Sequence, residues 1–360
     1  MSERCAVVVY GATGFTGRLV CAELVRKGVG FVAAGRDAGK LRVLSDSLGG
    51  IETAVAALDD AGALERVAAR ARVVLDCAGP FARWGRAVQN AALAARSHFL
   101  DITGEHVYMR ETYARDAEAR DRGVVLVNAV GFDVVPTDAA AALAAEAAGA
   151  PIARVRIAFA AKGARPTQGT MRSAVDAAHL GSLAWLDGEW RREPVAAERM
   201  TAPFPPPIGP RHCISVPWGD VVTAPRSTGA REVRTFMSFK AGPLLEPLAR
   251  VAGALLGLGP VKSLVERRIA RAPEGPSDDE RARSRFAVYA DAEGAHGRRA
   301  AWVTGGNGYD FTAASAVVCA TRAAAPDFTA RGALTPTQAF GARALLDALA
   351  ESGVRWGLAE

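Results

Sequence analysis

The chain has 360 residues, half of them hydrophobic, so it is long enough for two domains with sizeable cores and is not of the disordered class. The formal net charge of +6 comes mostly from arginines scattered among acids, without a dense basic block, so we expect no nucleic-acid partner. Five dispersed cysteines without metal-type spacing indicate reduced thiols and no metal site, and neither a signal peptide nor a transmembrane-length apolar run is recognisable.

Apolar runs alternate with helical patterns over the first 136 residues. The predicted strands are 4–10, 31–35, 53–58, 72–79, 97–103 and 124–130. Predicted helices between them include 37–48, 61–70, 84–95 and 106–121. Such alternation implies βαβ units, so the sequence predicts an α/β fold with a Rossmann-type doubly wound parallel sheet. Ligands of such sheets bind at the carboxyl ends of the strands.

The pattern changes to α+β after residue 136. Predicted helices are 137–148, 170–187, 244–270 and 336–353, and predicted strands are 154–162, 214–227, 231–240, 284–294 and 298–306. Residues 202–212 are rich in proline and predict a loop. We therefore expect a Rossmann domain over 1–136 and an α+β substrate or dimerisation domain over 137–330. A C-terminal helix within 331–360 is expected to pack back on the Rossmann domain.

Three glycines, Gly11, Gly14 and Gly17, lie between the first strand and the first helix. The first permits a tight turn, the second lets the backbone approach a pyrophosphate, and the third lets the helix lie close to the sheet. The helix N-terminus adds free N–H groups and a positive dipole end. The predicted dinucleotide contacts in this loop are Gly11, Ala12, Thr13, Gly14, Phe15, Thr16 and Gly17. The alternative is a tight turn that holds no ligand.

The residue after the second strand distinguishes NAD from NADP. Arg36 stands where an NAD enzyme usually has an acid, and Lys40 follows closely. A guanidinium suits a 2′-phosphate, so the predicted cofactor is NADP(H). Asp37 fits either a helix cap or a ribose ligand. Asp59, after the third strand, fits either an adenine-side contact or a helix N-cap.

Small and acidic residues follow the fourth, fifth and sixth predicted strands, at the carboxyl edge of the sheet. The turn after the fourth strand lets nicotinamide or ribose lie on the backbone, which predicts cofactor contacts at Ala78, Gly79 and Pro80. Carboxyl groups in such a cleft can have a raised pKa and act as acids. The candidate catalytic residues are Asp101, Glu105 and Asp133. The alternative is that Thr103 or Asp138 caps a helix and that Asp133 stabilises its turn.

A series of motifs runs along nearly the whole chain. In order they are GATGFTGRLV, AAGRD, LDCAGPFARWG, DITGE, GFDVVPTD, QGTMRSA, PWGDVVTAPRSTG, EGPSDDERARSRF, GGNGYDFTA and GALTPTQAFGARALLDALAESGV. Together they resemble the saccharopine dehydrogenase-like oxidoreductases, and most closely the bacterial trans-acting enoyl reductases. The resemblance implies an NADP-type Rossmann domain and a mixed-sheet domain. The sequence departs from the family pattern at 164–168 and 306–309.

The resemblance also implies hydride transfer to a polarised double bond. The preferred reaction is reduction of an enoyl bond in an acyl, lipid-like or carrier-bound substrate. Imine reduction of the saccharopine type and a non-catalytic dinucleotide-binding scaffold are the alternatives. The apolar, arginine-bearing segment 244–271 fits an acyl-chain cover, a homodimer surface, a peripheral membrane contact or a core helix. We expect a cytoplasmic protein, with peripheral membrane contact if that segment meets lipid.

Overall fold

The computed structural model describes residues 4–163, 165–177, 182–194, 196–238 and 259–359. The chain forms two compact units, each assembled from separate segments. The first unit contains residues 1–135 and 309–352, and the second contains residues 136–308 and 353–360. The first change of unit therefore lies one residue from the boundary expected after residue 136.

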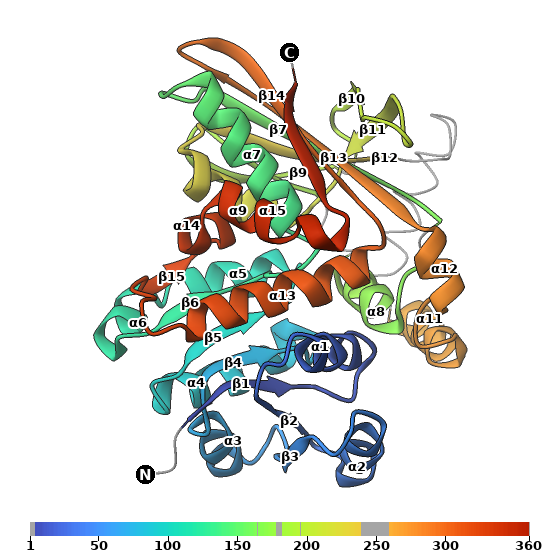
Figure 1. Cartoon of the computed structure of the whole chain (residues 1–360). Coiled ribbons are helices and arrows are strands. Elements are labelled where there is room, and N and C mark those ends of the chain that lie inside the picture. Colours follow the sequence, from blue (N-terminus) through green and yellow to red (C-terminus); the bar gives the residue numbers. More distant parts are fainter. Residues whose placement is uncertain (1–3, 164, 178–181, 195, 239–258, 360) are drawn as a thin grey trace. The chain divides into compact units, whose positions relative to one another are not determined.

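A seven-stranded parallel sheet forms the centre of the first unit, and helices lie on both of its faces (Figure 1). The strand order is β15-β6-β5-β4-β1-β2-β3, which is the doubly wound Rossmann order with β15 added at one edge. The predicted fold class is thus confirmed for this unit. The strands are β1 (Cys5–Tyr10), β2 (Phe31–Gly35), β3 (Glu52–Val55), β4 (Ala71–Asp76), β5 (His98–Asp101), β6 (Val125–Val127) and β15 (Gly332–Leu334). The helices are α1 (Phe15–Arg26), α2 (Ala38–Ser47), α3 (Ala61–Ala68), α4 (Phe81–Ala94), α5 (His106–Tyr113), α6 (Asp116–Arg122), α13 (Gly308–Ala324), α14 (Pro336–Phe340), α15 (Ala342–Ala348) and the 3₁₀ turn η3 (Ala350–Ser352).

The central strands of this sheet are buried on both faces. In β1, Val7, Val8 and Val9 are at most 1% exposed, although successive side chains point to opposite faces. Parallel strands covered by helices on both sides read as continuous apolar runs for this reason. The same burial explains why the sequence placed these strands correctly.

The segment 309–330, expected in the second domain, belongs to the first unit. Strand β15 pairs in parallel with β6, so this part of the chain extends the Rossmann sheet. Helix α13 packs beside it, with the Tyr309 ring edge-on to Phe15 at 5.4 Å between centroids. Thr312 Oγ1 also accepts a hydrogen bond from the Phe132 N–H at 3.0 Å. These contacts join segments far apart in the sequence.

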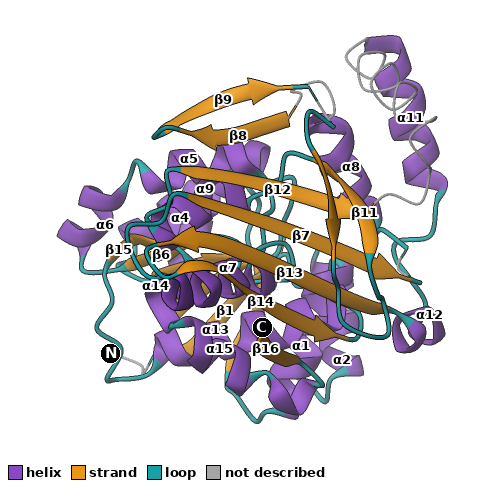
Figure 2. Cartoon of the chain, turned by 90° about the horizontal axis from the view of Figure 1, so that it is seen from above, coloured by secondary structure: helices purple, strands orange, loops and turns teal. Residues whose placement is uncertain are grey.

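A nine-stranded mixed sheet forms the second unit, seen face-on in Figure 2. Its main path is β10-β11-β12-β7-β13-β14-β16, and the β8–β9 hairpin joins it through β12. The strands are β7 (Arg154–Lys162), β8 (Ser182–Leu186), β9 (Glu189–Glu193), β10 (Arg199–Ala202), β11 (Arg211–Ser215), β12 (Glu232–Ser238), β13 (Arg285–Gly294), β14 (Gly297–Gly305) and β16 (Arg355–Ala359). The helices are α7 (Val135–Ala148), α8 (Gln168–Ala177), α9 (Asp220–Thr228), α11 (Gly259–Arg271) and α12 (Asp278–Arg283). The expected α+β character is confirmed.

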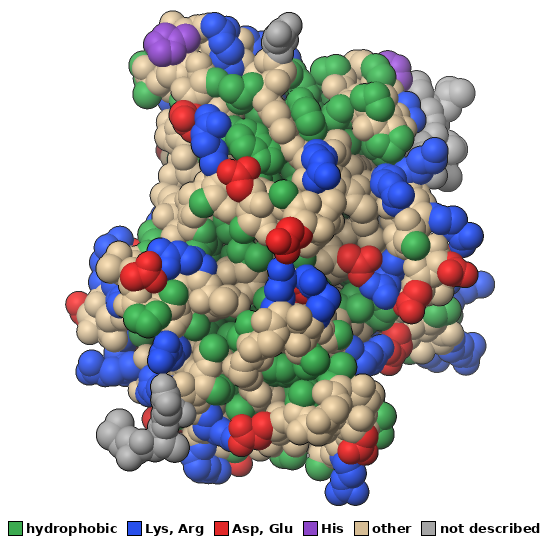
Figure 3. All heavy atoms as spheres, viewed as in Figure 1, with side chains coloured by type: hydrophobic (Ala, Val, Ile, Leu, Met, Phe, Trp, Pro, Cys, Tyr) green, Lys and Arg blue, Asp and Glu red, His purple; other side chains and the backbone are tan. Residues whose placement is uncertain are grey.

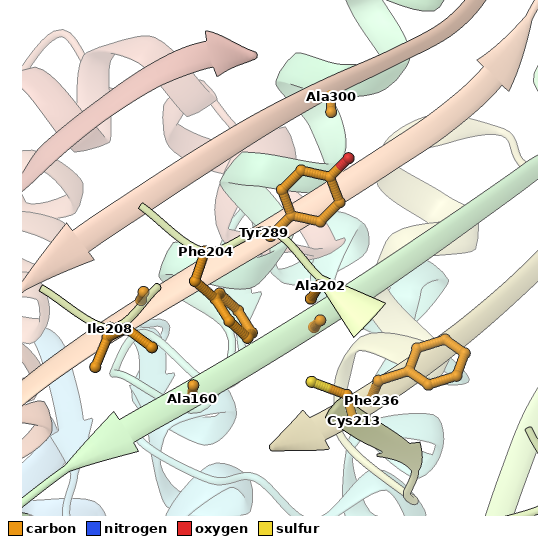
Figure 4. Close-up of a cluster of buried hydrophobic side chains, with 10 residues drawn as sticks. Ala160, Ala202, Phe204, Ile208, Cys213, Phe236, Tyr289 and Ala300 are labelled. Atoms are coloured by element: carbon orange, nitrogen blue, oxygen red, sulfur yellow. The ribbon is translucent and has the colours of Figure 1, made fainter. Parts of the chain in front are cut away.

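The proline-rich segment between β10 and β11 covers one face of this sheet. Phe204 and Ile208 from that segment are 3% and 4% exposed (Figure 4). They pack in a cluster with small residues of the strands, among them Ala160, and with Tyr289 and Phe236. The segment predicted as a loop therefore covers part of the hydrophobic core on this face of the sheet.

The predicted strand 214–227 is wrong beyond β11, because α9 occupies its second half. Its Val221 and Val222 favour a strand locally, but both are buried against the sheet in helical form. Pro225 has no N–H to donate to the carbonyl of Val221 four residues earlier. The indole N–H of Trp190 donates to that carbonyl instead, at 3.3 Å. Tertiary packing thus overrides local propensity here.

Three predicted helices are broken. The segment 170–187 contains the end of α8 and then β8, whose hairpin turns at Asp187 and Gly188, both with positive φ. The segment 336–353 divides into α14 and α15 at Gly341, where φ is 81°. The segment 106–121 divides into α5 and α6. Helices α14 and α15 belong to the first unit, and the chain then ends in strand β16, which pairs with β14 in the second unit.

Only part of the predicted helix 244–270 can be compared with the structure, because residues 239–258 lie outside the described residues. Its described part is α11, in which Leu264 is 61% exposed and Arg267 and Arg268 are exposed. In the described parts of the chain, no helix has both the length and the apolar character needed to cross a bilayer.

Charged side chains of both signs are interspersed on the face shown in Figure 3. In the second unit, arginines also compensate buried acids. Asp291 is 1% exposed and accepts hydrogen bonds from Arg156 at 3.1 Å and from Arg298 at 2.9 Å. Arginines at this site therefore act as counter-ions inside the fold.

Candidate functional site

The glycine loop has no room for side chains at two of its three glycines. Gly11 has φ of +77°, and a Cβ on it would lie 2.8 Å from the Ala78 nitrogen. A Cβ on Gly17 would lie 2.2 Å from the Gly11 carbonyl oxygen. The first glycine therefore permits the turn and the third the close approach of α1, as predicted from the sequence.

Helix α1 presents its N-terminus without a side-chain cap. Gly14 occupies the N-cap position, no acid lies in the first turn, and among the described residues no side chain caps the first N–H groups. A Cβ on Gly14 would lie 3.3 Å from the Gly11 oxygen, a close contact within the same loop. Free N–H groups, a positive helix end and a bare backbone suit the diphosphate of a dinucleotide.

Helix α4 provides a contrast on the same sheet edge. Its first N–H groups, those of Phe81 and Ala82, donate to the carboxylate of Glu105 at 3.0 and 2.8 Å. An internal anion thus occupies the N-terminus of α4. Of these two helices, α1 is the one left open to an external anion.

The residues proposed to bind the adenosine end of the cofactor have different roles in the structure. The carboxylate of Asp37 accepts a hydrogen bond from the Lys40 N–H at 3.0 Å and caps α2. Arg36 is exposed and forms no ion pair or hydrogen bond with another described residue. The Arg36 guanidinium therefore remains available for a 2′-phosphate, while Asp37 has the capping role.

Asp59 does not cap α3, because the neighbouring Asp60 accepts the Ala63 N–H at 2.8 Å. The charges of Asp59 and Arg36 both act on the Tyr10 hydroxyl, so both groups lie within electrostatic range of it. Burial raises the pKa of Tyr10 to about 12, and its hydroxyl donates to the Ala56 carbonyl at 3.0 Å. The adenine-side role of Asp59 stays a prediction.

The turn after β4 lies directly against the glycine loop. Ala78 and Pro80 are partly exposed and Gly79 is exposed, so the backbone of this turn is accessible. The N–H of Ala78 donates to Asp76 Oδ1 at 2.8 Å, which fixes the turn. The predicted cofactor contacts at Ala78, Gly79 and Pro80 thus adjoin Gly11, as a dinucleotide site requires.

The three candidate catalytic acids lie at the same edge, in different environments. Asp101 is fully buried and accepts hydrogen bonds from the Thr103 N–H, the Ala129 N–H and the Asn128 amide at 3.0, 2.9 and 2.5 Å. Burial raises the pKa of Asp101 to about 7. These contacts give Asp101 a structural role, like the capping role of Glu105.

Asp133 is partly accessible, as is Glu105, but the Glu105 carboxylate already accepts the first N–H groups of α4. Burial and then the charge of Glu105 raise the pKa of Asp133 to about 6. A Cβ on Gly104 would lie 2.7 Å from Asp133 Oδ2, so this carboxyl lies close against the chain after β5. Among the three candidates, Asp133 best fits an acid that exchanges protons with a ligand.

Asp76 is the residue at this edge that the sequence analysis missed. It ends β4, is fully buried, and has one carboxyl oxygen without a hydrogen-bond partner among the described residues. Burial raises the pKa of Asp76 well above its ordinary range. The sequence signal that could have identified Asp76 is an acidic residue at the carboxyl end of an apolar strand, in the motif LDCAG.

Other polar residues of the sheet and its turns have structural roles. His98 Nδ1 accepts the Val125 N–H at 3.0 Å, and burial lowers the pKa of His98 to about 4. Burial raises the pKa of the Cys77 thiol, which disfavours a nucleophilic thiolate. Within the described ranges, no three acidic, histidine or cysteine side chains form a metal-binding group.

Comparison with known proteins agrees with this geometry. Residues 7–127 match the family described as the saccharopine dehydrogenase NADP-binding domain. A trans-acting enoyl reductase of Mycobacterium ulcerans is 34% identical over 139 residues, which cover 37% of this chain and 33% of that protein. A lipid droplet localized protein of Caenorhabditis elegans is 35% identical over 151 residues, covering 38% of this chain and 35% of that protein. The matched part thus spans about a third of each curated relative.

Among solved structures, the L-Glu-forming saccharopine dehydrogenase of Saccharomyces cerevisiae matches with a TM-score of 0.64. The match covers 98% of this chain and 99% of that chain at 15% sequence identity, so it shows the fold. The uncapped α1, the bare Gly14 and the available Arg36 all fit the dinucleotide of the matched family. The cofactor is therefore NADP(H).

Proposed function

Because residues 7–127 match the saccharopine dehydrogenase NADP-binding domain family, we propose that the protein reduces the enoyl double bond of an acyl substrate. This reaction would make the protein an NADP(H)-dependent oxidoreductase. The observation that carries the proposal is the uncapped N-terminus of α1 behind a bare glycine loop. The names of the enoyl reductase relatives support the choice of a carbon–carbon double bond.

The bound nicotinamide supplies a hydride to the β-carbon of the acyl group. The N-terminus of α1 holds the cofactor's diphosphate, and the Arg36 guanidinium holds its 2′-phosphate. The accessible backbone of the turn at Ala78–Pro80 would lie beside the ribose. These residues bind and orient the cofactor and take no part in proton transfer.

Asp133 is the residue that we assign to proton transfer. Reduction places negative charge on the carbonyl oxygen and needs a proton at the α-carbon. A carboxyl with a pKa near 6 retains a proton in an appreciable fraction of molecules at neutral pH. The negative charge of Glu105 repels a negative charge on Asp133, which helps to keep Asp133 protonated.

We also propose a substrate class and a contact surface for the protein. The substrate is acyl or lipid-like, free or attached to a carrier. The exposed leucine and arginines of α11 support contact of that helix with an anionic lipid surface. A homodimer is the competing explanation for this surface.

The proposal is tested by NADPH consumption with matched substrates. The panel contains enoyl thioesters of short and long chain length, a cyclic imine, and the saturated thioesters as blanks. We expect consumption with enoyl thioesters, and loss of that activity in Asp133→Asn with unchanged NADPH binding. Consumption with the imine alone would establish the saccharopine-type reaction instead. Tight NADPH binding without consumption for any substrate would indicate a scaffold.

A further inference from the structure

Buried polar side chains form a row across the carboxyl end of the Rossmann sheet. Tyr10 of β1 is in register with Asp76 of β4, and Asp76 is in register with Asp101 of β5. Residues in register on neighbouring strands point to the same face, so the two carboxyls are neighbours. Asn128 continues the row by its hydrogen bond to Asp101. Asp76, Asp101 and Asn128 are all 0% exposed.

The two carboxyls are stabilised unequally. Asp101 accepts three hydrogen bonds, and such donors favour a carboxylate. Asp76 accepts one, from the Ala78 N–H, and its Oδ2 has no partner among the described residues. Burial raises the pKa of Asp76 well above its ordinary range, and the charge of Asp101 raises it further. The pair therefore retains its last proton on Asp76.

Asp76 also connects the sheet to the glycine loop. Its Oδ1 holds the Ala78 N–H, and the Cys77 N–H donates to the Tyr10 carbonyl at 2.8 Å. A Cβ on Gly11 would lie 2.8 Å from the Ala78 nitrogen and 2.9 Å from the Cys77 carbonyl carbon. Because no space separates the two segments, a shift of this turn displaces the first glycine of the cradle.

We propose that Asp76 is a positioning residue for the cofactor, which in its uncharged form holds the Cys77–Pro80 turn against Gly11. The inference rests on the NADP(H) assignment and not on the enoyl substrate. An ionised Asp76 places a second buried charge beside Asp101, and the turn then opens to admit water. Among the described residues, the titratable groups that interact electrostatically with Asp76 are Asp101, Tyr10, Tyr108 of α5 and Cys77, and Cys77 in turn interacts with Cys21 of α1. All of them are acids, so none compensates a charge on Asp76.

The test compares Asp76→Asn with Asp76→Ala by calorimetric titration of NADP⁺ between about pH 6 and about pH 9.5. Asparagine keeps an acceptor for Ala78 without a charge, and alanine removes the acceptor. Asp60→Asn is the matched control, because Asp60 also accepts one backbone N–H at 2.8 Å but is exposed. Affinities are expressed relative to the parent protein, so that the effect of ionisation of the cofactor's own phosphate on affinity cancels.

We expect Asp76→Asn to bind within about twofold of the parent near neutral pH, and progressively better than the parent as the pH rises. We expect Asp76→Ala to bind about tenfold more weakly while its circular dichroism is unchanged. The proposal is overturned if Asp76→Asn binds as weakly as Asp76→Ala, or if its affinity relative to the parent does not change with pH. If Asp76→Ala does not fold, the pH dependence of the NADP⁺ affinity of Asp76→Asn, relative to the parent, tests the proposal by itself. NADP⁺ binding without enoyl reduction refutes the proposed function and leaves this inference standing.

Discussion

Asp101→Asn should make the protein more stable at alkaline pH. In the parent, Asp101 is buried and its folded-state pKa is about 7, against an ordinary value of 3.8. A carboxyl with a raised pKa favours folding while it is protonated. Its contribution is therefore present in full below about pH 4 and is lost as the pH rises to about 7. Asparagine stays neutral throughout and removes this loss.

The structure sets the magnitude. A shift of about three units corresponds to about 4 kcal/mol in total, and to about 3 kcal/mol between about pH 5 and about pH 8. The side chain is 0% exposed, so solvent screening does not reduce this figure. Asparagine keeps an oxygen acceptor for the Thr103 and Ala129 N–H groups. Asn128 Oδ1 has no partner among the described residues, so a turn of that amide lets it accept from the new amide.

The assay is urea unfolding of parent and variant at about pH 5 and about pH 8, followed by fluorescence and circular dichroism. The difference between the two proteins isolates Asp101 from other titrating groups such as Asp133 and His98. We expect the free energy of unfolding of the variant, relative to the parent, to rise by about 3 kcal/mol over this interval. Parallel pH profiles for the two proteins would refute the reasoning, because Asp101 would then be ionised with an ordinary pKa.

Three further predictions concern the loop, the cofactor and the surface. Gly17→Ala should abolish NADP(H) binding or destabilise the first unit, because its Cβ would lie 2.2 Å from a carbonyl oxygen. Gly30→Ala is the control, because a Cβ there would meet no atom within 4 Å. Equal behaviour of the two variants in calorimetry and thermal unfolding would contradict the prediction. Arg36→Ala should weaken NADPH binding by about 1–3 kcal/mol and leave NADH binding unchanged in fluorescence titrations. An equal effect on both cofactors would remove Arg36 from the 2′-phosphate site. Replacing Arg267 and Arg268 with Glu should lower co-sedimentation with anionic vesicles at low salt, whereas unchanged sedimentation or a split dimer would contradict the lipid contact.

The sequence predicted the parts of the fold that depend on local pattern. Strand β2 spans 31–35 and β7 spans 154–162, as expected, because continuous or alternating apolar runs mark buried strands. The prediction failed where distant segments meet. Strand β15 joins the Rossmann sheet through β6, more than 200 residues earlier. The helix α9 contains β-branched residues and a proline, and Trp190 supplies its missing hydrogen bond.

The candidate site shows the same division. The spacing of Gly11, Gly14 and Gly17 indicated the cradle, since each glycine meets a local need of the backbone. The role of Glu105 depends on the first N–H groups of α4, 24 residues earlier, and no local pattern reveals that contact. Asp76 was missed because its significance lies in an oxygen without a partner, which only the packed structure shows.

We propose that NADPH bound at this glycine loop delivers its hydride to an enoyl carbon. The most direct measurement uses NADPH carrying deuterium at C4 of the nicotinamide, in each stereochemical form, with a long-chain enoyl thioester and mass spectrometry of the product. We predict one deuterium at the β-carbon from one of the two forms, and none when Gly17→Ala replaces the parent. Deuterium that enters only a cyclic imine, or no transfer from either form to any acceptor while NADPH stays bound, would contradict the account.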